Sequence, residues 1–329
     1  RGPPLLIQIL LYYSVLRLAR LAFPGPASIL WCKNRLSVVY CHGTPPRAGY
    51  QRSWKVKNPM YLSDYHFHTL CSSDSPAPLA QQAKAAMAAG VREICVTDHW
   101  NLLDQQGNRL PAIYDWGPSL AQWKKLRSRW PGRLELRLGV EVGNGVLDPA
   151  AVDASLTLPE LDFVIGSLHS QSARAGGLGI FTAARACAGK EEGTAILDDY
   201  MDMLEELVDT QGWDVLGHII YPLRYIPAEY GLDLRPWRDR LAEILRRVIS
   251  QGKGIEFNTS AGATVDQWRE VLALYRDLGG QVLTLGSDAH RPQHMAAAFP
   301  EALELIRETG FRWLCVYRSR TPLFCKIDS

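Results

Sequence analysis

The chain has 329 residues, of which 47% are hydrophobic and 21% charged, an ordinary composition for a globular protein with a sizeable core. Its formal net charge of +2 averages two unlike parts, because residues 1–59 hold nine Lys or Arg and no acidic residue, while all 34 acidic residues lie in 60–329. That acidic body excludes a general basic surface for long nucleic acid. The seven cysteines form no CxxC pair, which argues against a disulfide framework and predicts a reducing, cytoplasmic location.

Residues 1–59 form a basic N-terminal extension whose nature the sequence leaves open. The apolar run 5–16 is short for a membrane span, and Arg17 and Arg20 then interrupt it. Three interpretations compete, namely a membrane-surface segment, a disordered basic arm and a non-native extension upstream of a true start at Met60. We favour the third, because the acidic and periodic part of the sequence begins with Met60. We expect this extension to contribute nothing to the chemistry.

Strand-like and helix-like segments alternate from Met60 onward. Apolar runs rich in Val, Ile and Leu predict buried parallel strands at 61–66, 93–97, 134–141, 162–168, 213–218, 254–258 and 281–286, with a final strand at 311–317. Helical periodicity and stop signals predict helices at 78–89, 120–130, 194–210, 234–250, 264–278 and 294–309. About seven strand–helix units predict an α/β fold with a closed or nearly closed (β/α) barrel. A doubly wound open sheet is the alternative.

One stretch, residues 170–193, breaks this alternation. It is rich in Ala and Gly, has little clear period and directly follows a predicted strand. A mobile lid over the site and an ordinary insertion loop both fit this composition.

Six of the eight histidines, together with several carboxylates, fall at predicted strand ends. They are His66, His68, His99, His169, His218 and His290, with Asp64, Asp74, Asp98, Glu141, Glu256 and Asp288 beside them. In a parallel barrel the carboxyl ends of all strands meet on one face, so we expect these side chains to converge there. Imidazole and carboxylate ligands suit Zn, Mn or Fe, and so many of them predict two to three divalent ions.

Individual positions point to individual roles. His66 and His68 form an HxH pair that can ligate one ion from the same side of an extended strand. Glu141 ends the third strand and can bridge two ions. Asp74 follows in a Ser-rich loop, where it can reach a neighbouring ion or cap a turn. Asp98 can act as a ligand, as a partner that orients a ligand or as a proton donor.

The segments DYHFHT, SSD, VTDH, GVE, GSLH, GH and SDAH resemble, in this order, those of the PHP (polymerase and histidinol phosphatase) family, and within it the histidinol-phosphatase branch. The resemblance covers essentially all of 60–329 and none of 1–59. It implies a distorted (β/α)7 TIM-like barrel and three metal ions held by nine ligands. The implied ligands are His66, His68, Glu141 and Asp288 for the first ion, Glu141 with His169 and His218 for the second, and Asp74, His99 and His290 for the third. Asp74 stands where some relatives have His.

The stretch GHIIYPLRY resembles the branch's segment after the fifth-strand His, which implies that Arg224 faces phosphate. A planar guanidinium suits a phosphate fork, although a surface arginine is the alternative. Arg291 is a second candidate for phosphate binding, with a structural ion pair at the rim as the alternative. EFNTSA resembles the branch's sixth-strand ending and makes Asn258 a candidate for polar lining or for a structural cap.

The reaction that the resemblance implies is hydrolysis of L-histidinol phosphate to L-histidinol and phosphate in histidine biosynthesis. Bound ions would lower the pKa of water, and Arg224 would position the phosphate. Asp98 is a candidate donor to the leaving alkoxide. We find no GxSxG elbow and no P-loop, which excludes serine hydrolases and nucleotide kinases.

Three alternatives remain. They are a PHP phosphoesterase acting on nucleotides or other small phosphate esters, a metal-holding module without turnover, and a metal amidohydrolase. In each phosphatase case the partner is a small-molecule phosphate ester, and for 60–329 we expect neither long nucleic acid nor a membrane.

Overall fold

The structure is a computed structural model that describes residues 27–32, 35–40 and 61–327. The chain divides into two compact units, Arg1–Val56 and Lys57–Ser329. In the first unit, β1 (Ala27–Cys32) and β2 (Arg35–Tyr40) pair as an antiparallel hairpin, where the sequence predicted no strand. Apart from these two strands, the predicted extension, including its apolar run 5–16, lies outside the described residues. Among those described, no helix has the length and apolar character needed to cross a membrane.

Seven parallel strands form the barrel of the second unit. They are β3 (Ser63–Asp64), β4 (Glu93–Val96), β6 (Glu135–Gly143), β7 (Phe163–Ser167), β8 (Val215–Leu216), β9 (Gly254–Asn258) and β10 (Leu283–Gly286). A further short strand, β5 (His99–Asn101), continues β4 along β6 in the same register. Backbone hydrogen bonds from Tyr65 N to Leu285 O (2.9 Å) and from His68 N to Ala289 O (3.0 Å) join the first strand to the last. The predicted nearly closed (β/α)7 barrel is therefore confirmed, and the open sheet is excluded.

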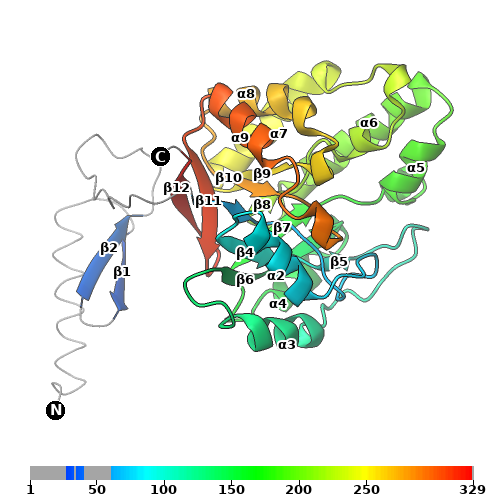
Figure 1. Cartoon of the computed structure of the whole chain (residues 1–329). Helices are drawn as coiled ribbons and strands as arrows, with labels where there is room; N and C mark the ends of the chain where they lie inside the picture. The colour runs from blue at the N-terminus through cyan, green and yellow to red at the C-terminus, as the bar shows by residue number, and fades with distance from the viewer. Residues whose placement is uncertain (1–26, 33–34, 41–60, 328–329) are drawn as a thin grey trace, which may run out of the picture. The chain divides into compact units, whose positions relative to one another are not determined.

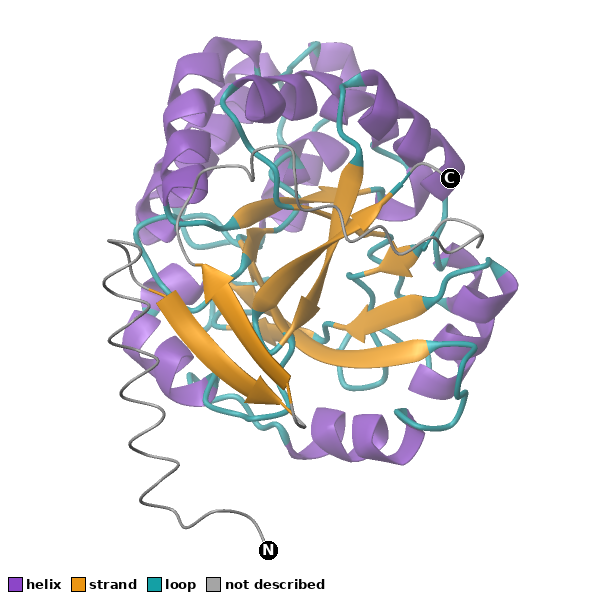
Figure 2. Ribbon diagram, turned by 90° about the vertical axis from the view of Figure 1, so that its left-hand side faces the viewer, coloured by secondary structure: helices purple, strands orange, loops and turns teal. Residues whose placement is uncertain are grey.

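Helices cover the outside of this barrel (Figures 1 and 2). They are α2 (Leu79–Ala88), α3 (Gly117–Leu126), α4 (Pro149–Ser155), α5 (Ile180–Ala186), α6 (Lys190–Leu207), α7 (Arg238–Ser250), α8 (Arg269–Asp277) and α9 (Phe299–Glu308). All six predicted helices are present with shifted ends. The helix predicted to begin at residue 234 begins as α7 at Arg238, because Pro236 lies in a preceding 3-10 turn.

The segment 170–193 is largely helical rather than the loop that its composition predicted. It contains a 3-10 turn (Ala173–Ala175), α5 and the first residues of α6. Ile180 and Ala184, four residues apart on α5, are buried against the rest of the protein. A seven-residue helix rich in Ala shows too short an apolar stripe to be recognised from its period.

A C-terminal hairpin closes the amino-terminal end of the barrel. The predicted final strand is present as β11 (Trp313–Arg318), but it pairs with β12 (Thr321–Lys326) and does not join the barrel sheet. One buried cluster joins side chains of the barrel interior to β11; its members are Tyr65, Cys95, Phe163, Ile165, Val215, Cys315, Val316 and Tyr317. This end is therefore a packed core, and we expect the functional site at the opposite, carboxyl end of the strands.

Candidate active site

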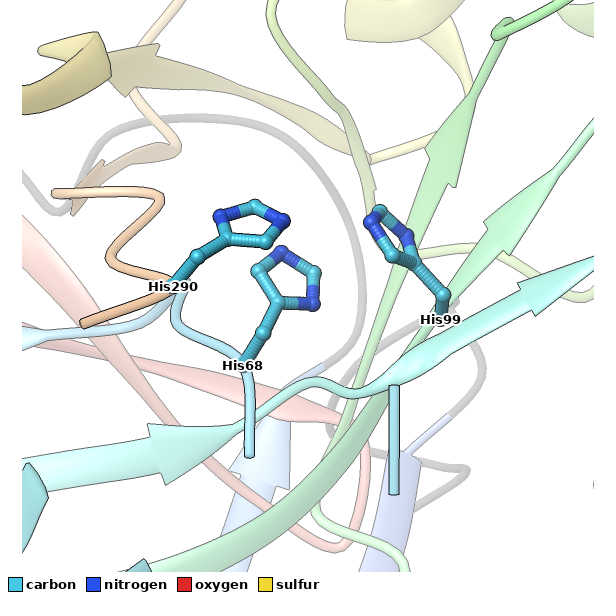
Figure 3. Close-up of side chains that lie close together, drawn as sticks. All are labelled: His68, His99 and His290. Carbon is cyan, nitrogen blue, oxygen red and sulfur yellow. The ribbon is translucent and has the colours of Figure 1, made fainter. Parts of the chain in front are cut away.

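The structure brings all nine predicted ligands together at the carboxyl ends of the strands. His66 and His68 follow β3, His99 begins β5, Glu141 lies in β6, His169 and His218 follow β7 and β8, Asp288 and His290 follow β10, and Asp74 comes from the loop after β3. Figure 3 shows the rings of His68, His99 and His290 pointing toward one another from separate elements. Residues up to 224 positions apart in the sequence thus share one site because the barrel closes, as the sequence predicted.

Glu141 lies at the centre of this site and is fully buried. Its Oε1 is 3.1 Å from His169 Nε2 and 2.8 Å from His218 Nε2, and these two ring nitrogens are 3.2 Å apart. Burial opposes ionisation of Glu141, but the nearby imidazoles, those of His169, His66 and His99 first among them, hold its pKa well below its usual value. Oε1 and the two nitrogens thus form one triangle of potential ligands.

The other carboxylate oxygen of Glu141 faces a second set. Oε2 lies 3.4 Å from His66 Nε2 and 3.7 Å from His68 Nε2, while Asp288 Oδ1 is 3.6 Å and 3.2 Å from the same nitrogens. Ligands that bind one ion tetrahedrally at 2.0–2.1 Å stand about 3.4 Å apart, close to these separations. The buried Glu141 Oε2 also lies 2.7 Å from His99 Nδ1, so this oxygen faces the third histidine as well. The carboxylate of Glu141 is therefore placed to bridge two sets.

Asp74, His99 and His290 form a third, more open set. Asp74 Oδ2 is 3.3 Å from His99 Nε2 and 3.3 Å from His290 Nε2. The ring of His68 lies beside both histidines, with centroid distances of 4.0 Å to His99 and 4.2 Å to His290. The side chain of Asp74 is 53% exposed, so this set faces solvent while the other two are buried.

The hydrogen bonds of the imidazoles fit metal ligation. The outer nitrogen of several rings is anchored, since His66 Nδ1 meets Glu256 Oε1 (2.6 Å), His169 Nδ1 meets Asn101 Oδ1 (2.8 Å) and His290 Nδ1 meets Asp288 O (2.9 Å). A ring nitrogen that donates outward leaves the other nitrogen as a lone pair. The Nε2 lone pairs of His66 and His68 face each other at 3.1 Å and repel, and a cation between them would remove that cost. The donor set therefore suits divalent ions of the Zn, Mn or Fe type.

Asp98 is buried behind the ligands. Its carboxylate accepts hydrogen bonds from Thr69 N (2.6 Å), Ser72 Oγ (2.9 Å) and Gln122 Nε2 (3.2 Å). Ser72 Oγ also lies 3.1 Å from His68 Nδ1, so Asp98 acts on the His68 ring through one hydroxyl. Burial raises the pKa of Asp98. Of the three roles that the sequence left open, these contacts favour orientation of a ligand.

Arg224 ends a 3-10 turn (Tyr221–Arg224) that follows β8, and its side chain is only 3% exposed. Nη1 donates to Asp288 Oδ2 at 2.7 Å, and the guanidinium lies 5.3 Å from the centre of the Tyr221 ring. Its Nε and Nη2 are buried without a partner among the described residues. Two unpaired donor nitrogens of a fixed cation beside the carboxylates point to a bound anion, because a buried donor without an acceptor is costly.

The two remaining candidate substrate-binding residues, Arg291 and Asn258, differ in their exposure to solvent. Arg291 follows His290 directly, but its side chain is exposed to solvent. Asn258 is fully buried, and its Nδ2 lies 3.1 Å from Glu256 Oε1 and 3.4 Å from Asp288 Oδ2. Asn258 therefore supports carboxylates of the site from behind.

The sequence placed Glu256 at the site but did not reveal which ligands it orients. Glu256 holds His66 Nδ1 and also accepts from His218 N (2.9 Å), so one carboxylate fixes two ligand positions. Gly286 makes room for it, because a Cβ there would lie 2.3 Å from Glu256 Oε1. Asn101 is the one supporting residue that the sequence could have revealed, because it stands two residues after His99 and therefore on the same face of a strand.

Comparisons with known proteins agree with this geometry. The sequence profile of the PHP domain matches residues 64–260. The chain is 25% identical over 262 residues to the histidinol-phosphatase of Lactococcus lactis, covering 77% of this chain and 93% of that protein. It is 29% identical over 272 residues to a probable histidinol-phosphatase of Deinococcus radiodurans, covering 76% of this chain and 95% of that protein.

Among solved structures, the L. lactis histidinol phosphate phosphatase in complex with Zn, L-histidinol and phosphate superposes with a TM-score of 0.68 at 24% identity. It covers 80% of this chain and 98% of that one, a likeness that supports the fold. Because the PHP domain profile matches more than half of the sequence, this chain belongs to the PHP domain family.

Proposed function

We propose that this chain is a histidinol-phosphatase, a phosphoric monoester hydrolase that converts L-histidinol phosphate to L-histidinol and phosphate in histidine biosynthesis. The observation that carries the proposal is the position of Arg224, whose two unpaired buried donors lie beside the carboxylate of Asp288 in the cluster around Glu141. Curated relatives named histidinol-phosphatase or probable histidinol-phosphatase match along nearly their whole length, which supports the choice of substrate.

The three sets of side chains would hold three divalent ions. His66, His68, Glu141 and Asp288 would hold the first, Glu141 with His169 and His218 the second, and Asp74, His99 and His290 the third. Such ions, when bound, lower the pKa of water toward neutrality and neutralise charge on phosphoryl oxygens. Zn, Mn and Fe all suit these ligands. The solvent-facing position of Asp74 makes the third ion the one most easily lost.

The protein's own groups position the phosphate. Arg224 offers Nε and Nη2 to two phosphate oxygens, and its ion pair with Asp288 keeps the guanidinium in place. Asp98 keeps the His68 ring oriented through Ser72, and Glu256 does the same for His66. Since most of these groups are buried, their charges act with little screening by water on the charge that develops at phosphorus.

The partner of this site is a small-molecule phosphate ester. The ligands of this site are mostly buried, so we expect no long nucleic acid to reach it. We propose a cytoplasmic location, which the five free cysteines of the described barrel unit support.

The proposal is tested by measuring phosphate release from L-histidinol phosphate and from a panel of nucleoside monophosphates and sugar phosphates, using the metal-loaded full chain. We expect kcat/KM for L-histidinol phosphate to exceed that for every other ester by at least about tenfold, since a built site discriminates by several contacts. The variant Asp288→Ala, prepared in parallel, should release no phosphate, which excludes a contaminating phosphatase. A higher kcat/KM for a nucleotide or sugar phosphate would assign the chain to another substrate within the same family.

A further inference from the structure

A row of aromatic rings leads from the buried histidines to the surface. The Tyr221 ring lies 4.6 Å from that of His218, the Tyr225 ring 5.2 Å from Tyr221, and the Phe181 ring 4.9 Å from Tyr225. Exposure rises along the row, with Tyr221 8% exposed, Tyr225 half-buried and Phe181 38% exposed. The row therefore forms a continuous apolar wall that begins beside Arg224 and ends in solvent.

The outer end of this wall is fixed relative to the ligands. Phe181 lies in α5, and the residue before it, Ile180, donates its N–H to His169 O at 2.7 Å. Gly179 N donates to Gln105 O at 3.0 Å, which ties the start of α5 to the loop after β5. The guanidinium of Arg185, one turn further along α5, lies 5.3 Å from the centre of the Phe181 ring. The ring of Phe181 is thus held at a set position with respect to His169.

We propose that Phe181 and Tyr225 form the subsite for the ring of the substrate's organic group, and that Phe181 determines specificity. This inference rests on the proposed function, because it takes the phosphate to lie beside Arg224. In L-histidinol phosphate an ester oxygen and three carbons separate phosphorus from an imidazole ring, and the middle carbon carries an ammonium group. Aromatic rings stack on imidazole and attract cations, whereas a simple alkyl phosphate gains neither contact.

The proposal also explains why a partly exposed phenylalanine, Phe181, lies beside a polar site. Its apolar surface leaves water when a flat ring covers it, and that burial contributes to binding without taking part in the reaction at phosphorus. The effect should therefore appear in KM and hardly in kcat. An effect confined to KM distinguishes a residue that binds the substrate from a residue that only stabilises the fold.

The test compares Phe181→Ala and Phe181→Tyr with the wild-type full chain, on L-histidinol phosphate and on glycerol 3-phosphate, which has no ring. We expect Phe181→Ala to raise KM for L-histidinol phosphate about tenfold with kcat within about twofold, and Phe181→Tyr to restore the wild-type KM. Neither variant should change kcat/KM for glycerol 3-phosphate. Phe324→Ala is the matched control, because Phe324 is 46% exposed on β12, the hairpin strand at the other end of the barrel.

An unchanged KM in Phe181→Ala, or an equal loss on both esters, would overturn the subsite. If the wild type does not prefer L-histidinol phosphate, the proposed function fails, and phenyl phosphate then replaces it as the ester that carries a ring. In that case a loss in Phe181→Ala confined to phenyl phosphate supports the aromatic wall, and equal effects on phenyl and glycerol phosphates reject it.

Discussion

At the scale of single residues, the site is built from ligands that sequence patterns reveal and from supports that they do not. The HxH pair of His66 and His68 is visible because both residues stand on one strand end. The contact of His66 with Glu256 joins positions 190 residues apart, and no local pattern encodes it. Asp98 shows the same limit, since its role depends on Ser72 and Gln122, which only the folded chain brings to its carboxylate.

The phosphate contact of Arg224 can be tested by Arg224→Ala. Loss of the buried guanidinium should raise KM for L-histidinol phosphate by about 10- to 100-fold, since charge-assisted hydrogen bonds to phosphate are strong. The metal content, measured by atomic emission, should stay the same. Arg291→Ala should have a much smaller effect, because that side chain is exposed. Unchanged kinetics in Arg224→Ala would remove this arginine from the phosphate site.

At the scale of elements, the repeated strands and helices were predictable because each carries its own apolar period. The helices that the sequence missed lack such a signal, since α4 and α5 each have seven residues. Of the hairpin of β11 and β12, the sequence predicted only β11, because its apolar pattern resembles that of a barrel strand. Its true place depends on Arg318, which makes a double ion pair with the fully buried Glu93 (2.6 Å for each oxygen).

We predict that Arg318→Met lowers the free energy of unfolding by about 3 kcal/mol, because it removes the two close hydrogen bonds of a cation to the buried carboxylate of Glu93 and leaves only Arg137 Nε, at 3.6 Å, among the described cations. Denaturant unfolding of the full chain measures the change. The matched control is Arg269→Met, which breaks an exposed pair with Glu308 (2.8 Å) and should cost less than about 1 kcal/mol. Equal losses in the two variants would show that the hairpin does not lock the end of the barrel.

At the scale of the whole molecule, the two ends of the barrel have opposite characters. The amino-terminal end is filled by aromatic and aliphatic side chains, and its charges are paired. The carboxyl end gathers histidine lone pairs and carboxylates that destabilise the chain unless cations neutralise them. Side chains that lower the stability of the fold are expected at the place where a protein carries its function. The role of residues 1–59 stays a prediction, since most of them lie outside the described residues.

The dependence on metal tests the central claim most directly. The full chain, stripped with a chelator, should release no phosphate from L-histidinol phosphate. Activity should return on titration with Zn or Mn and reach a plateau at two to three ions per chain, because the three sets around Glu141 would hold that number. Undiminished phosphate release by the stripped chain, with no bound metal by atomic emission, would contradict the account.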